Sequence, residues 1–174
     1  MIPLSLIHLV DPRLRPTIDW ALSNVGVSEI YRGSNRGPEI DDWARDLGSP
    51  PGGYWCALAV ARARKEAGLW IRSHDVDSPD EWVYQARKAR LVGLSPTPGA
   101  VVVYTRWKQH CSGRYAKRFE AVDLGLVVRV KPQVMAMKAC TNRGKYNRSG
   151  VVLGLREVEN ARVLCYIPPR KPRK

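Results

Sequence analysis

The sequence contains no run of about 18 apolar residues, the length that a membrane-spanning helix needs, so no membrane insertion is expected. Its four cysteines lie far apart, form no CxxC pair and have no zinc-binding spacing. We therefore expect free thiols, no metal site and no bound cofactor. The N-terminal segment 1–13 has neither a basic region nor a small-residue cleavage site. This predicts synthesis in the cytoplasm without a signal peptide.

Acidic side chains are scarce in the second half of the chain. Residues 101–174 hold 17 basic and only 4 acidic side chains, and they account for the whole formal net charge of +13. Residues 1–100 are neutral as a whole. Such an asymmetry indicates an anionic partner for the second half: nucleic acid, an anionic cell-wall polymer or an acidic protein. A basic surface that is simply solvated is the alternative.

Apolar residues are numerous enough to build a folded core. They make up 44% of the 174 residues, and six of them are Trp, which excludes a largely disordered protein. The length suits one domain. We expect this domain to span residues 1–168, followed by a flexible basic tail at residues 169–174.

The first half has the pattern of helices and the second half that of strands. Apolar residues at helical spacing, each set preceded by Pro or by a Gly-rich turn, predict four helices. Their expected starts are Pro16, Pro38, Trp55 and Pro79. The third helix is expected to end at Ala67 and the fourth to run toward Gly93. Five strand-like runs follow, at residues 100–105, 124–130, 133–139, 150–158 and 162–168. This order predicts an α+β domain with a largely antiparallel sheet.

Cys56 is the residue that most directly suggests chemistry. It follows a Gly-rich turn and lies in the first turn of a predicted helix. Backbone N–H groups and the helix dipole favour an anion there and lower the pKa of a thiol. A catalytic cysteine also needs a histidine to accept its proton and a polar group to orient that histidine. The alternative is a small buried residue between alanines.

The chain resembles a family of cell-wall hydrolases at this point. Residues 34–48 (SNRGPEIDDWARDLG) and 50–68 (PPGGYWCALAVARARKEAG) look like the cysteine motif of the CHAP domain, the cysteine, histidine-dependent amidohydrolase/peptidase. Later family motifs are matched in order by residues 97–102, 122–127, 136–142, 150–151 and 166–168. The resemblance covers roughly residues 17–168. It implies a papain-like fold, with N-terminal helices packed on a C-terminal sheet.

The resemblance also shows which catalytic positions are altered. Only Cys56 keeps the family residue, at the position of the nucleophile. Asp123 stands where the family has its catalytic histidine, and Lys138 and Cys140 replace polar residues of the third motif. An ionised aspartate is a poor base for a thiol, and its charge raises the pKa of that thiol. Lys138 offers a partner for Asp123 or support for a thiolate, and His110 is a candidate substitute base.

A basic segment lies between the first two predicted strands. Residues 106–119 hold five Lys or Arg side chains and three aromatic rings. Such mixing suits phosphate contacts with base stacking, or docking on an anionic polymer or protein. A solvated hairpin is the alternative. With a second cluster after Cys140, the candidate binding residues are Arg106, Trp107, Lys108, Arg114, Tyr115, Lys117, Arg118, Arg143, Lys145 and Arg148.

Three hypotheses follow for the function. The first is a phage or prophage protein on a CHAP-like scaffold that has lost hydrolysis and acts in binding or assembly, for example as a virion or tail component. It would be made in the bacterial cytoplasm and then become part of the virion or reach the cell wall. The second is an active peptidoglycan amidase or endopeptidase that uses Cys56. The third is a nucleic-acid-binding protein. The expected partners are peptidoglycan or another anionic polymer, an acidic virion protein, or nucleic acid.

Overall fold

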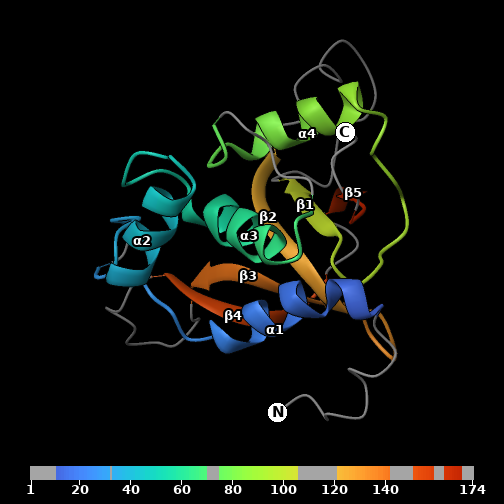
Figure 1. Ribbon diagram of the computed structural model, residues 1–174, viewed down its shortest axis with the longest axis horizontal. Helices are drawn as coiled ribbons and strands as arrows, with labels where there is room; N and C mark the ends of the chain where they lie inside the picture. Colours follow the sequence, from blue (N-terminus) through green and yellow to red (C-terminus); the bar gives the residue numbers. More distant parts are fainter. Residues whose placement is uncertain are drawn as a thin grey trace.

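The structure is a computed structural model. The part of the chain that it describes contains four helices and a five-stranded sheet (Figure 1). The described residues are 11–31, 33–69, 75–105, 121–141, 151–158 and 163–169. Helices come first in the chain and strands after, so the predicted α+β class is confirmed. Within these residues, none of the helices has the length and hydropathy that crossing a membrane requires.

The helices begin where the sequence carries start signals. Pro lies in the first turn of α1 (Arg15–Ser23), α2 (Pro38–Asp46) and α4 (Pro79–Lys88), where its missing N–H loses no helical hydrogen bond. α3 (Trp55–Glu66) follows the Gly-rich turn. The Ser78 hydroxyl caps α4 by accepting a hydrogen bond from the Glu81 N–H at 3.4 Å.

The fourth helix is shorter than the sequence predicts. It ends at Lys88 instead of running toward Gly93. Arg90 has a left-handed backbone with φ 55°, which stops the helix. Gly93 then exchanges backbone hydrogen bonds with Tyr166 of the last strand, β5 (Val163–Ile167), at 2.8 and 2.9 Å. Pairing with a strand far along the chain therefore overrides local helical spacing.

The five strands form one antiparallel sheet in the order β4-β3-β2-β1-β5. Their bounds are β1 (Val101–Thr105), β2 (Ala121–Arg129), β3 (Met135–Thr141), β4 (Val151–Glu157) and β5 (Val163–Ile167). Every pairing is antiparallel, which confirms the expected sheet. β5 returns past three strands to pair with β1 at the edge.

The main core lies between the helices and one face of the sheet. α3 packs on β2 and β3, α1 and α2 pack against α3, and α4 packs on β2 (Figure 1). Side chains of β1 alternate between two clusters. Val101 and Val103 belong to the helix-covered core, and Val102 and Tyr104 belong to a smaller cluster on the other face. The start of α3 is thereby held against the middle of the sheet.

Candidate functional site

Cys56 is the second residue of α3 and belongs to the buried core. The residue as a whole is 9% exposed. Its thiol lies within hydrogen-bonding reach of the Asp123 carboxyl group and the Leu124 backbone on β2. The structure therefore brings together the cysteine and the aspartate that were singled out in the sequence.

This environment keeps the Cys56 thiol protonated. Burial raises its pKa, and the nearby Asp123 charge raises it further. Backbone N–H groups of Leu124 and Ala57 act in the opposite direction but are outweighed. The lowered pKa expected from the helix start alone is thus wrong, because desolvation exceeds the helix-end effect. The expectation that Asp123 raises the pKa of the thiol is confirmed.

Asp123 is held by a second group, Lys138 of β3. The Lys138 Nζ lies 2.9 Å from Asp123 Oδ2, and the two side chains are 22% and 21% exposed. The expected pairing of Lys138 with Asp123 is therefore present. The same Nζ lies 4.0 Å from the centre of the Tyr104 ring, a cation–π contact. Gly125 makes room for that ring, since a Cβ there would lie 3.3 Å from Tyr104 Cε2.

Among the described residues, the Cys56 thiol, the Asp123 carboxylate and the Lys138 ammonium group form a chain of polar groups that contains no histidine. A general base must accept the thiol proton at neutral pH, and a carboxylate paired with a lysine is too weak a base for this step. Burial raises the pKa of Asp123, although Lys138 and the Cys56 thiol pull it down. Asp123 therefore orients the thiol and Lys138 neutralises the carboxylate.

Replacing Asp123 is expected to change how stability depends on pH. Burial raises the pKa of Asp123 above its unfolded value, so the folded chain takes up a proton at a higher pH than the unfolded chain. The Asp123 contribution to stability therefore increases as pH falls from neutral toward about 4. We expect the free energy of unfolding of the wild type to rise over this range relative to Asp123→Asn. Urea unfolding followed by Trp fluorescence at each pH measures the free energy of unfolding. A difference between the two proteins that stays constant with pH would contradict the prediction.

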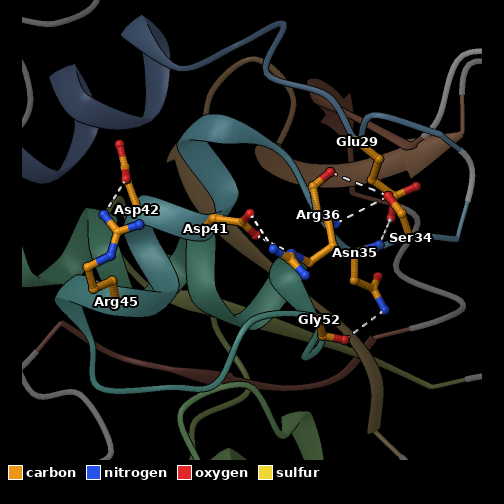
Figure 2. A network of polar contacts seen from close by, with 8 residues as sticks. All are labelled: Glu29, Ser34, Asn35, Arg36, Asp41, Asp42, Arg45 and Gly52. Atoms are coloured by element: carbon orange, nitrogen blue, oxygen red, sulfur yellow. Dashed lines mark hydrogen bonds and ion pairs between the residues drawn. The ribbon is translucent and has the colours of Figure 1, made fainter.

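A buried carboxylate that no sequence pattern indicated anchors the start of α3. Glu29 is 4% exposed, and it accepts hydrogen bonds from the Asn35 N–H at 3.3 Å and from Trp55 Nε1 at 3.0 Å. Asn35 Nδ2 donates to the Gly52 carbonyl at 3.3 Å (Figure 2). Because Trp55 directly precedes Cys56, this network fixes the backbone next to the thiol.

Arg36 extends the network to α2. Its Nε and Nη2 donate to the Asp41 carboxylate at 2.7 and 2.9 Å, which holds the pKa of Asp41 below its ordinary value (Figure 2). The bidentate geometry orients the loop between Glu29 and α2. A nearby pair between Arg45 and Asp42 is exposed and contributes little to stability.

Several predicted site residues lie outside the described part of the chain. His110 is one of them. Cys140 lies on β3, two positions after Lys138, but its side chain is not described. The basic candidates also fall outside: Arg106, Trp107, Lys108, Arg114, Tyr115, Lys117, Arg118, Arg143, Lys145 and Arg148. Their roles remain predictions from the sequence.

Among the side chains that the structure describes, no group of three or more His, Cys, Asp or Glu residues could hold a metal ion. Cys56 and Cys165 are free thiols. Comparisons of the chain with protein-family models, curated proteins and solved structures found no match. The fold and the site thus define an α+β protein in which a buried thiol lies beside a partly buried carboxylate–lysine pair.

Proposed function

We propose that this protein is a CHAP-like binding protein of phage or prophage type that does not hydrolyse its ligand. One observation carries the proposal: the Cys56 thiol faces a carboxylate that is already paired with Lys138. The thiol is placed as a papain-like nucleophile would be, at the start of a helix on a sheet. What surrounds it favours the thiol over the thiolate that attack requires.

The proposed partner is an anionic polymer of the cell wall, or an acidic protein of the virion. Support comes from the distribution of charge, since residues 101–174 carry the whole net charge of +13. A strongly basic half draws anionic partners from a distance and holds them in a salt-dependent way. Virion or tail assembly is the role that this combination of scaffold and charge fits best.

The proposal predicts binding to peptidoglycan without its breakdown. Purified protein incubated with cell-wall sacculi should sediment with them at low salt and be released at high salt. The turbidity of the suspension should stay constant, and Cys56→Ala should sediment to the same extent as the wild type. A basic protein of similar size and charge is the control for attraction by charge alone.

Two outcomes would overturn the proposal. Loss of turbidity with the wild type and not with Cys56→Ala would establish an active amidase or endopeptidase. Failure to sediment with sacculi, together with tight and steeply salt-dependent binding to DNA or RNA, would establish a nucleic-acid-binding protein instead.

A further inference from the structure

A cavity of about 400 Å³ lies beside the start of α3. The end of α2, the turn before α3 and the segment that leads into α4 form it. Its size falls within the range of small-ligand sites in proteins. The residues that line it are Leu47, Gly48, Ser49, Pro50, Tyr54, Asp75, Val76, Asp77 and Ser78. Cys56 and Asp123 are not among these residues, so the cavity is distinct from the site described above.

The charge of the cavity is opposite to that of the whole chain. Asp75 and Asp77 line it, and no described Lys, Arg or His side chain does. The formal net charge of the protein is +13. The N-terminal ends of α3 and α4 border the cavity, since Tyr54 and Ser78 are their N-cap residues. Helix N-terminal ends favour anions, so a cation bound here depends on the carboxylates and the aromatic ring of the lining.

Three further features suit a cation that carries an alkyl chain. The Tyr54 side chain is an aromatic surface on the lining, and the residue is 63% exposed. Ser49 Oγ is shielded from solvent and has no hydrogen-bond partner among the described residues, so it offers an acceptor. Leu47, Pro50 and Val76 supply apolar surface. Aromatic faces bind organic ammonium groups, and apolar walls bind the attached methylene groups.

We propose that this cavity binds an alkylammonium group, such as a lysine side chain, whether or not the function proposed above holds. The Asp77 carboxylate accepts a hydrogen bond from the ammonium group, Asp75 adds negative charge to the lining, and the Tyr54 ring covers the ammonium group. A divalent metal ion fits less well, because the described residues hold no group of three or more acidic, His or Cys side chains. The aromatic and apolar parts of the lining would also have no role in metal binding.

The test compares two small ligands by NMR titration of the full chain. Nα-acetyl-lysine amide carries the ε-ammonium group, and Nα,Nε-diacetyl-lysine amide has the same chain without the charge. We expect saturable shifts that include Tyr54 with the first ligand and at least about tenfold weaker binding of the second. The variant Asp77→Asn should bind the first ligand more weakly than the wild type by a similar factor. Asp80→Asn, an exposed acid on α4 that does not line the cavity, is the matched control.

A second variant moves the carboxylate without removing it. A Cβ on Gly53 would lie 2.0 Å from Asp77 Oδ2, so Gly53→Ala must displace this side chain. Weaker binding in Gly53→Ala supports the proposal. Equal binding of the two ligands by the wild type would overturn it, as would equal weakening by Asp77→Asn and Asp80→Asn. Saturable binding of calcium chloride that excludes the lysine ligand would assign the cavity to a metal ion instead.

Discussion

Replacing Arg64 with alanine is expected to lower the free energy of unfolding by about 3–5 kcal/mol. Arg64 is fully buried in α3. Its Nη1 donates to the carbonyls of Gly99 at 3.0 Å and Ile167 at 3.3 Å, and its Nη2 donates to the carbonyl of Pro168 at 3.2 Å. The side chain thus ties α3 to the turn before β1 and to the end of β5. Its loss leaves a cavity and three carbonyl groups without these donors.

The charge of Arg64 persists inside the protein. Burial lowers the pKa of Arg64 to about 9, which still leaves the guanidinium protonated at neutral pH. Arg64→Met keeps much of the volume and removes only the donors, so its loss of stability should be smaller than that of Arg64→Ala. Thermal unfolding measures both, with a shift of about 10 °C expected for Arg64→Ala.

Arg45→Ala is the matched control for Arg64. Arg45 is 76% exposed and pairs with the exposed Asp42 on the same helix, so its replacement should change stability by less than about 0.5 kcal/mol. A loss below about 1 kcal/mol in Arg64→Ala would contradict the structural role of this buried arginine.

The variant Asp123→Asn is expected to react with iodoacetamide at Cys56 at least about tenfold faster than the wild type at pH 8. The wild-type thiol is held protonated by burial and by the Asp123 charge. Asparagine removes that charge. This lowers the pKa of the thiol, and each unit by which the pKa falls raises the thiolate fraction about tenfold. Alkylation of each cysteine as a function of pH, followed by mass spectrometry, measures the effect.

Cys165 serves as an internal control in the same experiment. It is also a buried free thiol, and its pKa is raised by burial, with Arg87 as the nearby charge. Its rate should therefore be the same in the two proteins. Equal acceleration at both cysteines would show unfolding and not an electrostatic effect. An unchanged rate at Cys56 would show that Asp123 does not control this thiol.

Local signals in the sequence determined the elements of this fold. Pro at helix starts and the Gly-rich turn before Trp55 predicted where α2, α3 and α4 begin. β-branched runs predicted the five strands, and the order of elements predicted the α+β class. These features depend on residues within one turn or one strand, so their spacing is visible in the sequence. Cys56 at the start of α3 was predicted in the same way.

Contacts between distant segments were decided only by the tertiary structure. Through the family resemblance, the sequence alone indicated Lys138 as a partner for Asp123. It did not indicate that the Lys138 ammonium group also lies over the Tyr104 ring. Nothing in the local pattern indicated that Glu29 holds Trp55 or that α4 ends early to let Gly93 pair with β5.

The state of the Cys56 thiol was also decided by the tertiary structure. A helix start predicts a lowered pKa from local dipoles, but desolvation depends on everything that packs over the site. The sequence therefore determined which groups are present and in which elements, and the packing determined that they form a neutralised chain with a protonated thiol.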